Sequence, residues 1–198
     1  MKKTFLLIAT FATCLFASCN KEDKPDDKTK DDPKPEVCRV LEDFENDGML
    51  TWNAESGAQF TIVANPSKGG INTSDNVGKY VCADAEWDFT WTTAFGGSYD
   101  NPDYLKFTQD GYIVTVQCYA PAAGIPVYLK LEGDGVDPCE ITSVVTTKAN
   151  EWEVLEFDYE PYSLPDGAYR NFVICADAGG TTAGTVLYFD NFKEIKGE

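Results

Sequence analysis

The chain has 198 residues, no histidine and a formal net charge of −17 at pH 7. This length favours a single globular domain. The lack of histidine excludes Ser-His-Asp and Cys-His nucleophile systems and every His-ligated metal site. The negative charge repels phosphate backbones and anionic lipid, so we expect no nucleic-acid partner.

The N-terminus has the pattern of an export signal. Two lysines follow Met1, and residues 5–17 are an apolar run too short to span a bilayer as a helix. Small residues then precede Cys19. The segment 1–18 resembles a bacterial lipoprotein signal peptide, which implies lipidation of Cys19. The alternative is an ordinary secretory signal with an incidental cysteine.

The stalk, residues 19–36, is charged, and after Cys19 its only apolar residues are three prolines. Such a segment cannot bury enough surface to fold, so we expect a disordered, extended stalk. Lys21-Glu22-Asp23 resembles the signal that sends Bacteroidetes lipoproteins to the outer face of the outer membrane. The alternative is that any acidic tether looks alike. We expect a cell-surface protein that meets the membrane through its lipid anchor only.

Residues 37–198 are expected to be the globular domain. The first 36 residues contain seven basic and seven acidic side chains, so the whole net charge falls on this domain. It has five of the seven cysteines, at positions that give no zinc-type spacing: Cys38, Cys82, Cys118, Cys139 and Cys175. The export route permits disulfides, but the spacing assigns no pairing.

The periodicity of the domain is that of strands. Residues 127–132 partly alternate between apolar and polar side chains, and no window supports a long amphipathic helix. Clusters of Gly, Pro, Asn and Asp separate the runs. The pattern predicts an all-β, antiparallel β-sandwich, most simply a jelly roll. Its ten expected strands are 37–44, 58–64, 79–84, 88–95, 112–119, 127–132, 140–147, 155–159, 171–176 and 186–195.

Several segments, in this order, carry a resemblance to a known family. They are Asp43-Phe44-Glu45, Asn65-Pro66 followed by residues 70–77, the run 119–132, the run 147–158, and Tyr188-Phe189-Asp190-Asn191. This series resembles the β-sandwich carbohydrate-binding modules of Bacteroidetes surface lipoproteins, which are galactose-binding-like jelly rolls near the family 4/9 type. The resemblance spans nearly all of residues 38–195. It implies the fold, and it leaves open which glycan is bound and whether a concave face or a loop edge binds it.

The same resemblance implies a structural calcium site. In related modules an acidic residue of the first strand meets an aspartate of the last strand. The matching residues are Glu45 and Asp190, with Asp43 and Asn72 as lesser candidates. Calcium takes six to eight oxygen ligands, so carboxylates and carbonyls brought together here would suit it. The alternative is that these carboxylates face solvent or cap a turn.

Aromatic side chains are the strongest indication of a binding surface. In an uninterrupted strand, Trp87, Phe89 and Trp91 would share one face, with Asp88 and Thr90 on the other. That face is either core or an aromatic platform for sugar rings. Trp152 matches a family position that packs in the core, and Trp52 is expected in the core or at an edge. The following loop adds residue types that line sugar pockets, and the alternative is an ordinary solvated loop: Tyr99, Asp100, Asn101 and Tyr104.

Catalysis finds little support in the sequence. Glycoside hydrolysis needs two acids on either side of the scissile bond, and chance pairs are expected among the 26 acidic residues of the domain, which are the 33 of the chain less the seven before residue 37. The main hypothesis is therefore a non-catalytic surface lipoprotein that captures poly- or oligosaccharide, beside a neighbouring glycan-uptake complex. The alternative is a structural or adhesive module that binds protein partners. A glycoside hydrolase is the third hypothesis and the one with the least support in the sequence.

Overall fold

The computed structural model describes residues 37–47, 50–93, 113–133, 135–165, 169–177 and 183–195. All of them belong to the compact unit Pro35–Glu198. The helical segments within these ranges are two short 3-10 turns, Glu45–Asp47 and Glu160–Tyr162. No helix in the described ranges is long and apolar enough to cross a membrane.

The described residues form eleven strands. They are β1 (Val37–Glu42), β2 (Trp52–Glu55), β3 (Gln59–Ala64), β4 (Asn76–Val81), β5 (Phe89–Thr92), β6 (Ile113–Tyr119), β7 (Pro126–Gly133), β8 (Cys139–Val145), β9 (Trp152–Asp158), β10 (Tyr169–Ala176) and β11 (Val186–Ile195). Ten correspond to expected strands. The sequence did not indicate β2, because its four residues include no β-branched side chain. Pairing with β5 makes it a strand.

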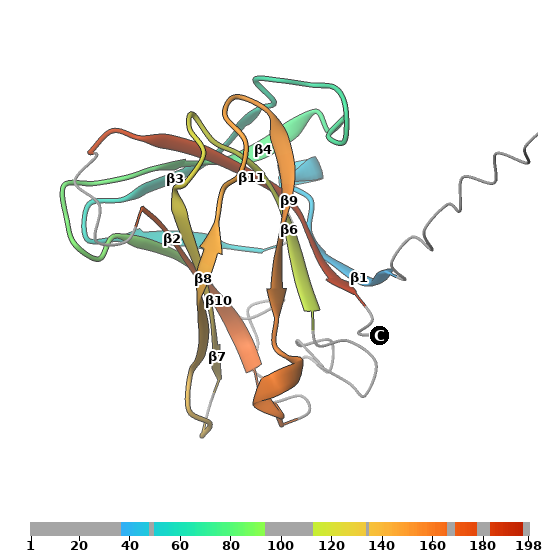
Figure 1. The fold of residues 1–198 in the computed structure, drawn as a ribbon, viewed down its shortest axis with the longest axis vertical. Coiled ribbons are helices and arrows are strands. Elements are labelled where there is room, and N and C mark those ends of the chain that lie inside the picture. The colour runs from blue at the N-terminus through green and yellow to red at the C-terminus, as the bar shows by residue number, and fades with distance from the viewer. Residues whose placement is uncertain are drawn as a thin grey trace, which may run out of the picture. The chain divides into compact units, whose positions relative to one another are not determined.

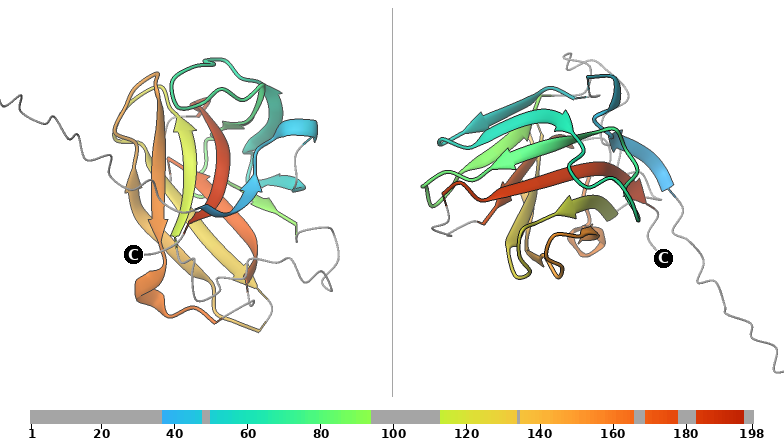
Figure 2. Two further views of the ribbon diagram at one scale, coloured as in Figure 1. Left: turned by 90° about the vertical axis from the view of Figure 1, so that its right-hand side faces the viewer. Right: turned by 90° about the horizontal axis from the view of Figure 1, so that it is seen from above.

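The strands form two antiparallel sheets that pack as a jelly-roll β-sandwich, which confirms the predicted fold (Figure 1). The first sheet has the order β3-β4-β11-β6-β9, with β1 also paired to β11; the second has the order β2-β5-β10-β7-β8. In Figure 2, left, β9, β6, β11 and β1 lie side by side in front of the second sheet.

The core lies between the sheets and follows strand alternation. In β7, Val127, Leu129 and Leu131 are fully buried, whereas Tyr128 and Lys130 between them point to the other face. Each such buried side chain contributes about 1.5–3 kcal/mol. The large apolar side chains therefore fix which face of each strand turns outward.

One end of the core is an aromatic cluster built around Trp52. Its ring stacks on Phe60, with centroids 4.6 Å apart, and also contacts Phe44 and Phe192. The indole Nε1 donates a 3.2 Å hydrogen bond to the buried carboxylate of Glu42. Trp52 is therefore a packing residue, one of the two roles expected from the sequence.

A loop covers part of the outer face of the first sheet. We call residues 65–75, between β3 and β4, the covering loop. The indole of Trp152 donates to Ser67 O at 2.9 Å, and Gln117 Nε2 donates to Ile71 O at 3.0 Å. These bonds hold the covering loop against β6 and β9.

This arrangement corrects the expected place of Trp152. The side chain is 4% exposed, so it is buried as predicted, but it is not part of the core between the sheets. Trp152 pairs with Tyr119, which points outward because Cys118 and Ala120 beside it point into the core. The covering loop, rather than the second sheet, buries Trp152.

Candidate functional site

The outer face of the second sheet carries the predicted aromatic residues. Phe89 and Trp91 of β5 are partly exposed, while Thr90 and Thr92, which alternate with them, are fully buried. Trp87 lies in the turn before β5, and 55% of its surface is exposed. The structure thus places Trp87, Phe89 and Trp91 on one face, as the alternation predicted. We call this outer surface of the second sheet the open face.

Strand pairing brings polar and apolar residues of other strands beside these rings. Trp91 pairs with Asn53 of β2 and with Val173 of β10. Val173 in turn pairs with Lys130 of β7, which pairs with Glu140 of β8. Because directly paired residues point to the same side of a sheet, these five side chains form one row across the open face.

Two adjoining depressions lie on the open face and share the side chains of Phe89, Lys130 and Val173. The smaller, of about 240 Å³, is also lined by Trp87, Tyr128, Glu140 and Cys175. The larger, of about 400 Å³, is also lined by Glu55, Ser56, Trp91, Glu132 and Asn171. Both volumes are of the order of small-molecule sites.

The larger depression is the more polar of the two. Lys130 Nζ forms a 2.7 Å ion pair with Glu132. Two buried amide atoms nearby, Asn171 Oδ1 and Asn53 Nδ2, have no hydrogen-bond partner within the described part of the chain. An unpaired buried polar atom costs about 1–3 kcal/mol. These two atoms form an acceptor and a donor left unused on the strands that flank Trp91.

The turn that carries Trp87 is anchored from below. The Asp88 carboxylate accepts a hydrogen bond from Ala83 N–H, and the Asp88 carbonyl accepts one from Tyr80 Oη at 3.0 Å. Asp88 and Tyr80 are both buried. The backbone on each side of Trp87 is therefore tied to the core, while its ring stays exposed.

Cys175 forms part of the wall of the smaller depression. Burial raises the pKa of this thiol to about 12, and the nearby Asp88 and Asp177 add to the effect. At neutral pH the side chain is a neutral thiol and behaves as a small apolar group. Cys82, Cys118 and Cys139 are likewise buried free thiols.

The remaining predicted binding residues are not placed. Tyr99, Asp100, Asn101 and Tyr104 lie outside the described residues. The sequence reasoning missed Tyr128, Lys130, Asn53 and Asn171. The alternation in residues 127–132 indicated that Tyr128 and Lys130 share a face, but only strand pairing brings that face beside Phe89 and Trp91.

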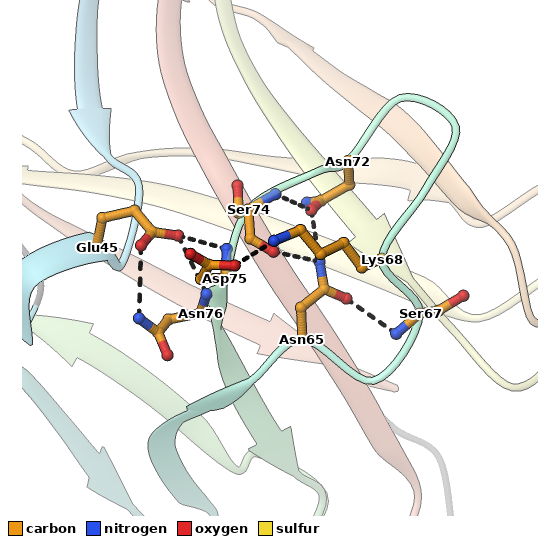
Figure 3. A network of polar contacts seen from close by, with 8 residues as sticks. All are labelled: Glu45, Asn65, Ser67, Lys68, Asn72, Ser74, Asp75 and Asn76. Atoms are coloured by element: carbon orange, nitrogen blue, oxygen red, sulfur yellow. Dashed lines mark hydrogen bonds and ion pairs between the residues drawn. The ribbon is translucent and has the colours of Figure 1, made fainter.

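Two residues of the expected calcium site, Glu45 and Asn72, lie at the covering loop (Figure 3), and Asn72 contacts a third, Asp190. Asp190 is fully buried, and its Oδ2 accepts hydrogen bonds from Asn72 Nδ2 at 2.6 Å and Asn191 Nδ2 at 3.0 Å. Burial raises the pKa of Asp190, and the charge of Asp43 adds to this, while bonds from Ser74, Asn72 and Asn191 lower it. Glu45 instead accepts the backbone N–H groups of residues 75 and 76.

Backbone groups fix the orientation of each amide in this network. Ser74 N–H donates to Asn72 Oδ1, so Asn72 Nδ2 must turn toward Asp190 and Gln117. Gln117 Nε2 donates to Ile71 O, so its Oε1 must face Asn72 and Asn191. A flip of either amide would place a donor against a donor or an acceptor against an acceptor.

This donor set does not fit a calcium ion as it stands, because N–H groups occupy the oxygens that a cation would need. Among the described residues, no three acidic or thiol side chains gather where they could hold a metal ion. Calcium at Glu45, Asp190, Asp43 and Asn72 therefore stays a prediction of the sequence resemblance.

Comparison with known proteins finds similarity only in structure. No protein-family model matches the chain, and no curated protein matches its sequence. The CBM22-1–GH10 modules of a Clostridium thermocellum xylanase, complexed with xylohexaose, align with a TM-score of 0.52 and 14% identity, over 81% of this chain and 29% of that one.

Two further structures have similar scores. One, from a study of promiscuous specificity in carbohydrate-binding modules of the β-sandwich superfamily, has a TM-score of 0.51 and 13% identity, over 80% of this chain and 62% of that one. An arabinose-bound α-L-arabinofuranosidase has a TM-score of 0.50 and 18% identity, over 82% of this chain and 26% of that one. This chain thus spans less than two thirds of each of the three. Likeness at such identities shows the fold alone, which is the β-sandwich fold of carbohydrate-binding modules.

Proposed function

We propose that residues 37–198 bind an uncharged poly- or oligosaccharide on the open face and do not cleave it. The observation that carries this proposal is the outward-facing set Trp87, Phe89 and Trp91 along two adjoining depressions. The C–H faces of sugar rings pack on aromatic rings, and a few polar groups beside them bind the hydroxyls.

The polar groups of the open face support this proposal. Asn171 lines the larger depression and its buried Oδ1 lacks a partner in the described part of the chain, so a hydroxyl that reached it would remove the cost of leaving it unpaired. Glu55, Glu132 and Glu140 line the depressions with one lysine. Their charge favours neutral sugars and opposes uronates and sulfates.

We further propose that the protein is held at the cell surface by a lipid on Cys19, and that it captures glycan for a neighbouring uptake complex. The signal-like residues 1–18, the Lys21-Glu22-Asp23 sequence and the charged stalk support this role. Metabolic labelling with an alkyne fatty acid should mark the wild-type protein and leave Cys19→Ala unmarked. Labelling of both, or protease protection of the domain on intact cells, would contradict the surface anchor.

Affinity gel electrophoresis against soluble neutral polysaccharides, followed by calorimetry, tests glycan binding directly. Trp91→Ala should weaken binding and leave the fold intact. Tyr162→Ala is the control, because Tyr162 is an aromatic residue, 52% exposed, that lines neither depression. Asn171→Ala should weaken binding with little loss of stability, since its buried Oδ1 has no hydrogen-bond partner to lose in the described structure.

The same assays separate the alternatives. A folded protein that binds no glycan in a broad panel would overturn the proposal and favour a structural or adhesive module. The release of sugar products from any bound glycan would show a hydrolase instead. Equal binding by wild type and Trp91→Ala would place the site away from the open face.

A further inference from the structure

The two depressions of the open face differ in chemistry. The larger contains the Lys130–Glu132 ion pair, Glu55, Ser56 and Asn171. The smaller has Trp87, Phe89, Tyr128, Val173 and Cys175 as its apolar and aromatic lining. A site built only for a uniform, hydroxyl-rich chain has no need of this asymmetry, because every sugar unit would present similar groups.

The shape of the smaller depression suits a flat ring. The rings of Trp87 and Tyr128 have centroids 6.2 Å apart and planes tilted by 48°, so they form two walls of a corner. Val173 and Cys175, 7% and 6% exposed, lie on β10 between the strands that carry the other lining residues. The volume is about 240 Å³. An apolar cavity of about 150 Å³ is enough to bind benzene.

The charges that line the smaller depression also favour an uncharged ligand. Its cation, Lys130, pairs with Glu132, which lines only the larger depression, so the positive charge of Lys130 is already compensated. Glu140 is the other charged residue of the lining and opposes an anionic group. The anchored turn around Asp88 holds Trp87 in place before any ligand arrives, which lowers the entropic cost of binding.

We propose that the smaller depression, walled by Trp87 and Tyr128, binds an uncharged aromatic group carried by the glycan, such as an aryl ester or aryl glycoside. The sugar units to which the group is attached lie in the larger depression, against Trp91 and Asn171. This subsite rests on the proposed glycan binding and adds a selectivity to it: arylated chains are preferred to plain ones.

Matched glycoside pairs test the subsite. Methyl and phenyl β-glycosides of xylobiose, cellobiose and galactobiose are titrated by calorimetry into wild type, Trp87→Ala, Trp91→Ala and Tyr162→Ala. In wild type, the phenyl member of a bound pair should bind roughly tenfold tighter than the methyl member, the scale of one well-buried aromatic contact. Trp87→Ala should abolish this preference, because it weakens the phenyl glycoside more than the methyl glycoside. Trp91→Ala should weaken both members by the same factor, and Tyr162→Ala should change neither.

The outcomes distinguish this inference from the proposed function. Equal affinities within every bound pair would overturn the aromatic subsite and leave glycan binding standing. The same holds if Trp87→Ala weakens both members equally, because Trp87 would then hold a sugar ring. If no glycoside and no polysaccharide binds to the folded protein, the proposed function fails and the subsite fails with it.

Discussion

The two outer faces of the sandwich carry similar aromatic side chains in different states. On the first sheet, Trp152 is 4% exposed beneath the covering loop, and its indole N–H is bonded to Ser67 O. On the second sheet, Trp87 is 55% exposed and forms the wall of a depression. The difference shows that an outward-facing tryptophan in this fold has a structural role when a loop buries its ring and accepts a hydrogen bond from its indole N–H. One that stays uncovered is available for a ligand.

The largest effect is expected for the covered face. Trp152→Ala should lower the free energy of unfolding by about 3–5 kcal/mol, because it leaves a cavity beneath the covering loop and removes the bond to Ser67. Chemical denaturation measures this change, with the exposed Trp87→Ala as the matched variant. A loss below about 1 kcal/mol would mean that the covering loop does not bury Trp152 in solution.

The open face should show the opposite pattern. Trp91→Ala should weaken glycan binding about 10- to 100-fold, on the scale of a central aromatic contact, and lower stability by less than Trp152→Ala does, because Trp91 is partly exposed. Calorimetry and denaturation of the same sample give both numbers. A large loss of stability with unchanged affinity would show that Trp91 is a packing residue. The aromatic residues of the two outer faces would then have the same structural role.

The polar network beneath the covering loop should have an intermediate effect. Asn72→Ala should cost about 1–3 kcal/mol, because it takes a donor from the buried carboxylate of Asp190. Thr73→Ala, an exposed change in the same loop, is the control. Excess EDTA should leave the melting temperature unchanged, since protein N–H groups already occupy Asp190. A melting temperature that falls in EDTA and recovers with calcium would instead support the predicted ion.

The smallest effect concerns pH. Burial raises the pKa of Asp190 above its ordinary value of 3.8. The folded state therefore holds this proton more tightly than the unfolded state, so the contribution of Asp190 to stability falls as pH rises through the raised pKa. The unfolding free energy of wild type minus that of Asp190→Asn should therefore decline as the pH rises from about 3.8 to the raised pKa of Asp190. A difference that rises with pH would show that hydrogen bonds, not burial, dominate.

The alternation of residues 87–91 was sufficient to place Trp87, Phe89 and Trp91 on one face. It could not decide whether that face was core, because a strand with aromatic residues on one side and Asp88 and Thr90 on the other fits either orientation. The structure shows Asp88 and Thr90 buried, each with a hydrogen-bond partner. Polar residues can therefore lie on the buried side of this strand, and the aromatic residues turn outward.

For Trp152, the sequence predicted burial but not the segment that buries the side chain. A tryptophan at the start of a strand is expected to be buried, and it is. Its burial beneath the covering loop depends on bonds between residues 85 apart in the chain. Local periodicity carries no information about such a contact.

The sequence by itself determined ten of the eleven described strands, the sandwich fold and the shared face of Trp87 and Trp91, because these follow from short-range alternation and turn residues. It also predicted the lipid on Cys19 from a local pattern. Only the tertiary structure decided which strands pair, and therefore that Tyr128, Lys130 and Asn171 join the tryptophans on the open face. It likewise placed amide groups of residues 72 and 191 against Asp190. Such placements depend on cross-strand register and loop docking, which arise from packing of the whole domain.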